Sequence, residues 1–256
     1  MIQAISAVIP VLDLMIGQIV LAKSGNRAEY RPLQARLTHR RRPPDGPQAI
    51  TNQTGCARLY LADNDSFAGA TPNSAVYNEL LDLGFGLWID ADWMAGDRCN
   101  QISEKIEKPE RLKVILSSET MASPDEFAKF DDLIARGIDP IFSLDKKGDA
   151  LITQPGELAK WTPLELVQQA YRRGVRNLIL LDLDSVGTMA GMSSETVGLG
   201  PLIQEIASEL KDLRMISGGG LRNAADVQAL LDSGCQHVLV ASAIHQCKLT
   251  PDDVSQ

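Results

Sequence analysis

Short apolar segments alternate with amphipathic segments along almost the whole of this 256-residue chain. The apolar segments lack the polar alternation of a sheet that has one face in water, and are typical of a parallel sheet covered by helices. Eight of them in regular alternation with helices predict an α/β fold, a closed (β/α)8 TIM barrel, in preference to an open doubly wound sheet. The predicted strands are Ile5–Leu14, Leu59–Ala62, Leu87–Ile89, Val114–Leu116, Ile141–Leu144, Leu178–Leu181, Leu213–Ile216 and His237–Val240.

The segments between the strands carry signals for helix starts and ends. Ser123, for example, precedes Pro124, so its hydroxyl can cap a helix whose first turn tolerates proline. Two stretches depart from the alternation: Gln18–Ala22, a predicted hairpin arm, and the polar, proline-rich residues 23–47, a predicted loop. We therefore predict one domain over residues 1–256. The predicted helices are Ser74–Leu83, Asp97–Lys105, Pro124–Ala135, Pro163–Arg173, Pro201–Leu210 and Ala225–Gly234.

The two halves of the chain resemble each other. Ile9–Asp13 in the first strand is similar to Ile141–Asp145 in the fifth, and Leu59–Ser66 in the second is similar to Leu178–Ser185 in the sixth. Two matches in the same order at similar offsets indicate an internal repeat. We interpret the barrel as two similar half-barrels, in which the matching acids lie on opposite sides of the mouth.

Acidic residues follow several of the predicted strands. Active sites of such barrels gather at the carboxyl ends of the strands, which makes Asp13 and Asp145 the first candidates for catalysis. Asp63 and Asp182 close the second and sixth strands, although the acids two residues further on could be the ones that face inward. Glu119 follows the fourth strand. For each of them the alternative is an acid that satisfies a turn or caps the next helix.

Three glycines stand between the seventh strand and the helix after it. Gly218, Gly219 and Gly220 let the backbone approach a ligand, and the helix start adds positive potential. Ala241 and Ser242 form a second small-residue turn after the last strand. In a barrel these two turns are the usual place of a phosphate site. A glycine triplet alone is often only a tight turn.

Charge and composition narrow the range of partners. The net charge of −8 argues against nucleic acid and anionic membranes, and we interpret Arg40–Arg42 as a solvated run. No apolar stretch approaches the roughly 18 residues of a membrane span, so we expect a cytoplasmic protein. The expected partner is a small phosphorylated metabolite, and the oligomeric state stays open. The cysteines are far apart and are expected to be reduced thiols: Cys56, Cys99, Cys235 and Cys247.

No metal ion or cofactor is predicted from the residues. The histidines, at positions 39, 237 and 245, are dispersed and form no zinc pattern. Asp90 and Asp92 have a spacing that could serve a hard cation, but no third oxygen ligand is evident beside them.

Several motifs together resemble a known family. They are the Ile-Pro-Val-Leu-Asp-Leu opening (Ile9–Leu14), the second strand with Asp63 and Asp65, the fifth-strand Asp145 followed by Gly148, Asp182 followed by Gly187, Thr188 and Gly191, and the Ser-Gly-Gly turn of strand seven. As a set they are similar to the histidine-biosynthesis barrels, the HisA/HisF family, over nearly the whole chain, and closer to its isomerase branch.

The resemblance implies a TIM barrel that rearranges an amino-aldose to an aminoketose by paired-carboxylate chemistry. One acid protonates the ring oxygen and one base takes the proton from C2. By position, Asp13 matches the base, Asp145 the acid, and Asp182 a further catalytic acid. Residues that match substrate-binding or phosphate-binding positions are Asp63, Thr188, Gly218, Gly219, Gly220, Ala241 and Ser242.

The chain departs from the family pattern after the third strand. The family has a Gly-Gly-Gly-Ile-Arg turn there for a second phosphate, and this chain has Ile89–Trp93 instead. The carboxylates of Asp90 and Asp92 would repel a phosphate dianion, and Trp93 is expected to obstruct close approach. Leu181 replaces a hydroxyl residue, and Val186 replaces an aspartate. We therefore expect one phosphate site where the family has two.

Three functions remain open from the sequence. The first is a HisA-like isomerase that acts on a phosphorylated sugar or an aminoimidazole ribotide-like substrate. The second is a diverged, non-catalytic or accessory barrel that binds a singly phosphorylated metabolite, for example in one-carbon metabolism. The third is a lyase or cyclase of the same family, against which the lost phosphate turn also counts.

Overall fold

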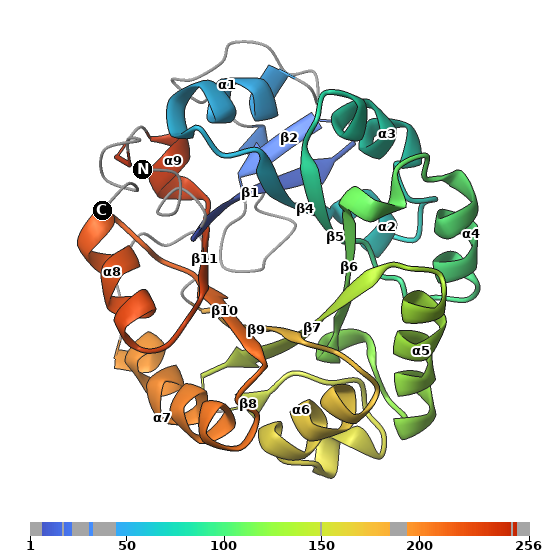
Figure 1. Ribbon diagram of the computed structural model, residues 1–256, viewed down its shortest axis with the longest axis vertical. Coiled ribbons are helices and arrows are strands. Elements are labelled where there is room, and N and C mark those ends of the chain that lie inside the picture. Colours follow the sequence, from blue (N-terminus) through green and yellow to red (C-terminus); the bar gives the residue numbers. More distant parts are fainter. Residues whose placement is uncertain are drawn as a thin grey trace.

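A computed structural model describes residues 7–16, 18–21, 31–32, 45–148, 150–184, 194–246 and 248–249 of the chain. Viewed down its short axis, the protein is a ring of strands enclosed by a ring of helices (Figure 1). Eight parallel strands close into the barrel, because the last of them pairs with the first through Val8 and Val238. The prediction of a (β/α)8 barrel is confirmed. In order around the ring the strands are β1 (Val8–Met15), β4 (Arg58–Asp63), β5 (Gly86–Asp90), β6 (Leu112–Ser117), β7 (Asp139–Lys147), β9 (Asn177–Asp182), β10 (Arg214–Gly218) and β11 (His237–Val240).

The two halves of the barrel share their strand register. On the β1–β4 pair Asp13 lies opposite Ala62, and on the β7–β9 pair Asp145 lies opposite Leu181. Both β1 and β7 also continue into an antiparallel hairpin, with β2 (Gln18–Leu21) and β8 (Ala150–Leu151) respectively. A third short strand, β3 (Arg31–Pro32), pairs with β2. These paired features agree with the half-barrel repeat, and the predicted hairpin arm is confirmed.

Helices fill the connections between strands, mostly where the sequence predicts them. At the start of one such segment the Ser123 hydroxyl accepts from the N–H of Asp125, and Glu126 completes a capping box. Short 3₁₀ turns occupy Pro109–Arg111, Ser118–Thr120, Pro124–Phe127 and Leu158–Lys160. The helices are α1 (Asp45–Thr54), α2 (Asn64–Phe67), α3 (Ser74–Asp82), α4 (Arg98–Lys105), α5 (Ala128–Ala135), α6 (Pro163–Arg172), α7 (Ser194–Glu209), α8 (Ala224–Asp232) and α9 (Ser242–His245).

The short helices α2 and α9 were not predicted, and two longer helices differ from the prediction. Helix α1 begins at Asp45, inside the segment 23–47 that was predicted as loop. The polar residues and prolines of this segment indicated a loop, but a proline in the first helical turn lacks only an N–H that would have no partner there. Ile50 then anchors α1 in the core. Helix α7 begins at Ser194, so that Pro201, predicted as its first residue, lies inside it.

The barrel interior is filled, not open. One large apolar side chain from each strand meets the others in an inner ring, which closes the floor beneath the mouth. The other apolar faces of the strands pack against the helices in a second, larger core. The inner ring consists of Ile9, Tyr60, Trp88, Ile115, Ile141, Ile179, Ile216 and Leu239.

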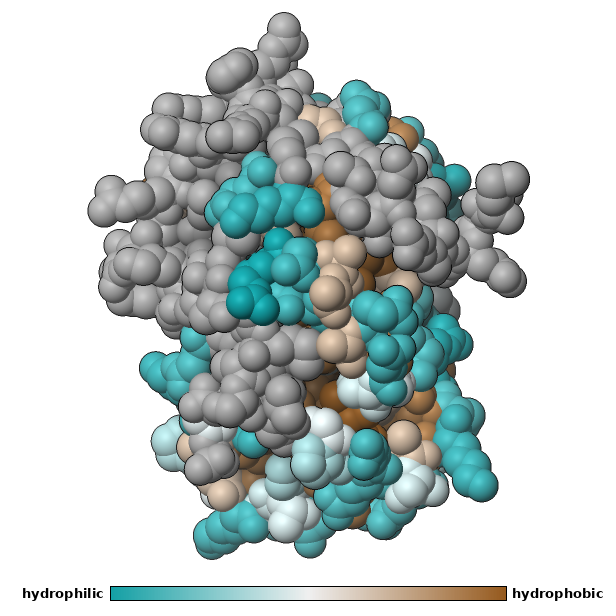
Figure 2. Space-filling view, turned by 90° about the vertical axis from the view of Figure 1, so that its left-hand side faces the viewer, coloured by the Kyte–Doolittle hydropathy of each residue, from teal (hydrophilic) through white to brown (hydrophobic). Residues whose placement is uncertain are grey.

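The outer surface mixes polar and apolar side chains. On the side of the barrel shown in Figure 2, hydrophilic residues cover most of the described surface and apolar ones lie in the recesses between them. Among the described residues, no helix is long and apolar enough to cross a membrane. Cys56, Cys99 and Cys235 are buried and unbridged, whereas Cys247, Arg40–Arg42 and most of the predicted 23–47 loop lie outside the described residues.

Ile16, at the end of β1, has an unfavourable backbone conformation. Its φ of 52° is left-handed, which a β-branched residue adopts at a cost of about 1–2 kcal/mol, and its side chain is 79% exposed. We expect Ile16→Asn to raise the free energy of unfolding by about 1 kcal/mol, because asparagine tolerates this conformation. Urea denaturation measures the change. Leu83→Asn is the control, because Leu83 is also exposed but has a φ of −71°. Equal effects of both variants would show that backbone strain is not the cause.

Candidate functional site

Strand alternation directs two of the predicted acids into the barrel mouth. Ile9 belongs to the inner ring, so Asp13, four residues further along β1, points to the same side. Ile141 and Asp145 stand in the same relation on β7. Because β1 and β7 are opposite members of the ring of strands (Figure 1), the two carboxylates approach the mouth from opposite walls.

The hydroxyl of Tyr60 connects these acids electrostatically. It lies in the inner ring and donates to Asp90 Oδ2 at 2.8 Å. Burial raises the pKa of Tyr60 well above its ordinary value, the Asp90 carboxylate raises it further, and the charges of Asp145 and Asp13 add to this. All three carboxylates are therefore within electrostatic range of one buried hydroxyl on the floor of the mouth. Tyr60 was not among the site residues predicted from the sequence, because nothing there distinguishes it from the other residues of an apolar strand.

Asp145 is held in a buried, hydrogen-bonded environment. Its side chain is 5% exposed, and its two oxygens accept from the hydroxyls of Ser117 and Ser143. Its own N–H donates to Ser118 Oγ at 3.3 Å. Burial is the main cause that raises the pKa of Asp145 to about 6, and the charge of Glu119 adds to it, against the hydrogen bonds from the two serines. The carboxyl group can therefore hold a proton up to about pH 6, well above the range of an ordinary aspartate.

Asp13 has a different set of neighbours. Its Oδ1 accepts from the side-chain amide of Asn64 at 3.3 Å, and the residue is 6% exposed. Asn64 directly follows β4 and begins α2, so the neighbouring strand positions the donor. The amide N–H can only donate, so Asp13 Oδ1 is an acceptor in this contact, as the oxygen of a base is.

Asp63 is built into a structural cap. Alternation on β4 directs it away from the inner ring, and the side chain is fully buried. Its oxygens accept from the N–H of Ser66, from the N–H and side-chain amide of Asn73, and from the Tyr77 hydroxyl. This geometry corresponds to the helix-cap alternative. A ligand-binding role for Asp63 stays a prediction.

Alternation along β9 also directs Asp182 away from the inner ring. Ile179 of β9 belongs to the inner ring, and Asp182 is three residues further on. Its Oδ1 accepts from the N–H of Asp184 at 3.1 Å. Burial raises the pKa of Asp182, and Lys146, its register partner on β7, acts in the opposite direction. Its catalytic role stays a prediction. Thr188, Gly187 and Gly191 lie outside the described residues.

The glycine turn after β10 requires glycine at each position. A side chain on Gly218 would come within 2.5 Å of the Leu239 carbonyl oxygen on β11. Gly219 and Gly220 have φ values of 104° and 67°, in the left-handed region. Helix α8 starts shortly afterwards, and the small-residue turn of Ala241 and Ser242 follows on the neighbouring strand. The two turns adjoin, as the prediction of a phosphate site requires.

The end of β5 and the turn after it carry two acidic residues, Asp90 and Asp92. Asp92 has a φ of 44°, a conformation that suits glycine, and its carboxylate forms an ion pair with Arg98 at 3.0 Å. Asp90 instead accepts from Tyr60, so the two acids serve different partners. The expectation that Trp93 obstructs the turn is wrong. Its ring is 1% exposed in the core, where the indole N–H donates to the Ile89 carbonyl at 2.9 Å.

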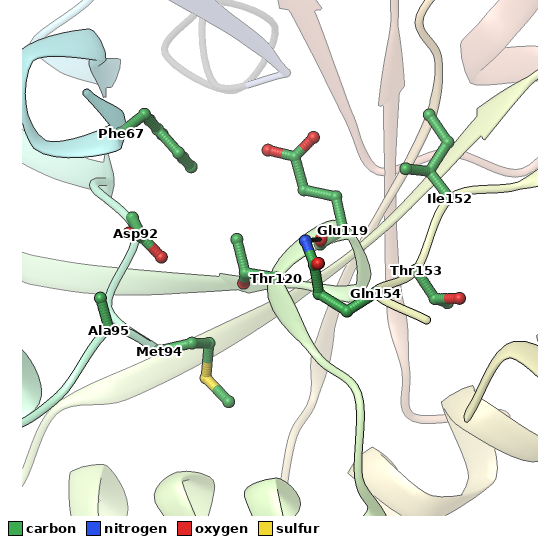
Figure 3. Close-up of a pocket in the computed structure, with 9 residues that line it drawn as sticks. All are labelled: Phe67, Asp92, Met94, Ala95, Glu119, Thr120, Ile152, Thr153 and Gln154. Carbon is green, nitrogen blue, oxygen red and sulfur yellow. Dashed lines mark hydrogen bonds between the residues drawn. The ribbon is translucent and has the colours of Figure 1, made fainter. Parts of the chain in front are cut away.

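A cavity of about 450 Å³ lies at the turn after β5 (Figure 3). Segments after four strands form its wall, and in the figure the Glu119 side chain projects into the space between Phe67 and Ile152. The cavity is therefore part of the barrel mouth, on the side of β5 and β6. The lining residues are Phe67, Asp92, Met94, Ala95, Glu119, Thr120, Ile152, Thr153 and Gln154.

The two histidines that the structure describes each contact another part of the barrel. His237 packs edge-on against the Trp88 ring at 5.6 Å between centroids. His245 is 4% exposed, with Nε2 3.2 Å from the Val11 carbonyl oxygen, and burial lowers its pKa to about 4. His39 lies outside the described residues. In the part of the chain that the structure describes, no three histidine, cysteine or acidic side chains group as metal ligands.

Comparison with known proteins gives one consistent result. A family model described as histidine biosynthesis protein matches residues 7–250. An uncharacterized protein of Methanocaldococcus jannaschii is 27% identical over 247 residues, 96% of each chain. An imidazole-4-carboxamide isomerase of Pectobacterium atrosepticum, whose name specifies two phosphoribosyl groups, is 26% identical over 249 residues, 94% of each chain. An isomerase of the same name from Haloarcula marismortui is 24% identical over 247 residues, 96% of this chain and 93% of its own.

Proposed function

The chain belongs to the histidine biosynthesis protein family, and from this premise we propose that it is an isomerase that converts a phosphorylated amino-aldose to an aminoketose. The observation that carries the proposal is the pair of inward-facing carboxylates, Asp13 and Asp145, on opposite strands of one mouth. Both are buried, and both act on the same hydroxyl, that of Tyr60. The reaction needs two acids with different protonation states in one site.

The surroundings of the two acids suit opposite roles. The pKa of Asp145 is raised to about 6, so this carboxyl group can donate a proton to the ring oxygen of the sugar as the C1–O bond breaks. The resulting iminium form has an acidic proton on C2. Asp13, which accepts from Asn64, takes that proton to give an enaminol. A proton added at C1 and the proton lost from the C2 hydroxyl then yield the aminoketose. The atoms balance, because the reaction is an isomerisation.

The phosphate of the substrate is assigned to the turns after β10 and β11. The backbone at Gly219 and Gly220 can approach an oxyanion closely, and α8 starts behind it. At the other rim, Asp92 and Glu119 line the cavity after β5 and β6, where negative charge opposes a second phosphate. The proposed substrate therefore has one phosphate, unlike the substrates that the relatives' names describe.

Substrate conversion tests the proposal. The full chain is incubated with the doubly phosphoribosylated imidazole-4-carboxamide of the named relatives, or with the N-phenyl derivative of 5-phosphoribosylamine, and the aldose and ketose forms are followed by ¹³C NMR. We expect conversion of the singly phosphorylated compound only. Preferred conversion of the doubly phosphorylated compound would contradict the loss of the second phosphate site. Saturable binding of the single phosphate without conversion would favour the alternative of a non-catalytic, accessory barrel.

A further inference from the structure

The residues that line the cavity after β5 and β6 take no part in the proposed reaction. We propose that this cavity holds a protonated amino group of the ligand, on an apolar or aromatic carbon skeleton. The inference rests on the proposed function only for its orientation, because the phosphate at the glycine turn places the other end of the substrate at this rim. The recognition itself depends on the cavity's own residues.

The polar part of the lining suits a cation. The two ionisable side chains among the lining residues are Asp92 and Glu119, both carboxylates. Arg98 pairs with Asp92 at 3.0 Å, and the charge of Glu119 reaches Asp145, whose pKa it raises. The Glu119 side chain projects into the space, and the polar side chains of Thr120, Thr153 and Gln154 complete the lining (Figure 3). An ammonium group carries three donors and suits such acceptors.

The apolar part of the lining argues for an organic cation over a metal ion. Phe67, Met94 and Ile152 come from different segments and line the same cavity. An aromatic face attracts a nearby ammonium group, and methionine adapts to a flat skeleton. A hard metal ion would instead need about six oxygen ligands. Here one of the two carboxylates is already engaged by a guanidinium group.

The size and position of the cavity fit the end of a small substrate. Its volume of about 450 Å³ lies in the range of ligand sites and exceeds what one ring needs. Glu119 follows the Ser117–Ser118 pair that contacts Asp145, and its charge contributes to the raised pKa of that acid. An amine beside Glu119 would therefore lie on the Asp145 side of the mouth.

Calorimetric titration with three matched probes tests the inference. Benzylamine carries an ammonium group, benzyl alcohol is its neutral counterpart, and benzyl phosphate is the anionic one. We expect the full chain to bind benzylamine about tenfold or more tightly than benzyl alcohol, the usual gain from a charge-assisted hydrogen bond. Benzyl phosphate should not bind at the cavity, although it can bind at the glycine turn.

Two variants locate the binding. Glu119→Gln should weaken benzylamine about tenfold and leave benzyl alcohol unchanged, since it removes charge but little volume. Glu205→Gln removes one charge from the outer helix α7 and should change neither. The inference is overturned by equal binding of amine and alcohol, by benzylamine binding that ignores Glu119→Gln, or by calcium chloride competing at equal concentration. Because no outcome depends on turnover, the isomerase proposal can fail or stand separately.

Discussion

Replacing Asp13 with asparagine is expected to lower kcat about a thousandfold, while substrate affinity changes less than threefold. The amide keeps the size of the side chain and can still contact Asn64, but it cannot take a proton from C2. General base catalysis contributes about 10²–10⁴ to such rates, which sets the expected size of the loss. Steady-state kinetics gives kcat, and calorimetry with the substrate gives the affinity.

A control on the outer surface separates this effect from a change in overall charge. Asp82→Asn also removes one carboxylate, but Asp82 lies at the end of α3 and pairs with the exposed Lys108. It should leave kcat unchanged. If Asp13→Asn retained more than a tenth of the wild-type kcat, Asp13 would not be the base. If the variant lost the far-UV circular dichroism of the parent, the kinetic comparison would move to Asp13→Glu, which keeps the charge and displaces the carboxylate.

Replacing Asp145 with asparagine should lower kcat and stabilise the protein at the same time. Loss of the general acid is expected to reduce kcat about a hundredfold or more. The stability gain follows from the buried charge, because the pKa of Asp145 is raised from 3.8 to about 6. A raised carboxyl pKa means that the folded state binds a proton more tightly than the unfolded state. Stability therefore falls as pH rises from about 4 to 6, and stays low above that range.

The size of the stability change follows from the pKa difference. About two pKa units correspond to roughly 3 kcal/mol, so the neutral variant should gain about 1–3 kcal/mol at pH 7 and little at pH 4. An asparagine can keep hydrogen bonds with Ser117 and Ser143, whose hydroxyls both donate and accept. Urea denaturation at both pH values measures the gain. A variant less stable than the parent at pH 7 would show that the burial of this carboxylate is not costly.

Two further variants assign the effect to this carboxyl group. Asp139→Asn changes an acid at the opposite end of the same strand, where it pairs with Lys113, and should leave both kcat and the pH dependence of stability unchanged. Glu119→Gln leaves Asp145 in place but removes a charge that raises its pKa. The rate should then begin to fall at a lower pH than in the parent. An unshifted pH profile would show that the charge of Glu119 does not act on Asp145 during the reaction.

The sequence determined the barrel, because the hydrophobic pattern that sets strand positions is local. It also singled out Asp13 and Asp145 as acids at matching strand ends, and the strand register agrees with that match. Their catalytic roles stay predictions. Helix α1 was missed because the polar, proline-rich composition of residues 23–47 indicated a loop, while the contact that anchors the helix, through Ile50, is tertiary. Local patterns therefore predicted most secondary-structure elements and the candidate site residues, but not the distant residues that these contact.

The tertiary structure decided which acids face the mouth and what surrounds them. Asp63 follows a strand as Asp13 does, yet it is enclosed by Asn73 and Tyr77 on the outward side of β4. Tyr60 meets Asp90 only because β4 and β5 pair in one register. The cavity likewise needs four segments, which the side-by-side pairing of β4, β5, β6 and β7 brings together. Burial, and with it pKa, depends on these distant contacts, which no local stretch of the chain contains.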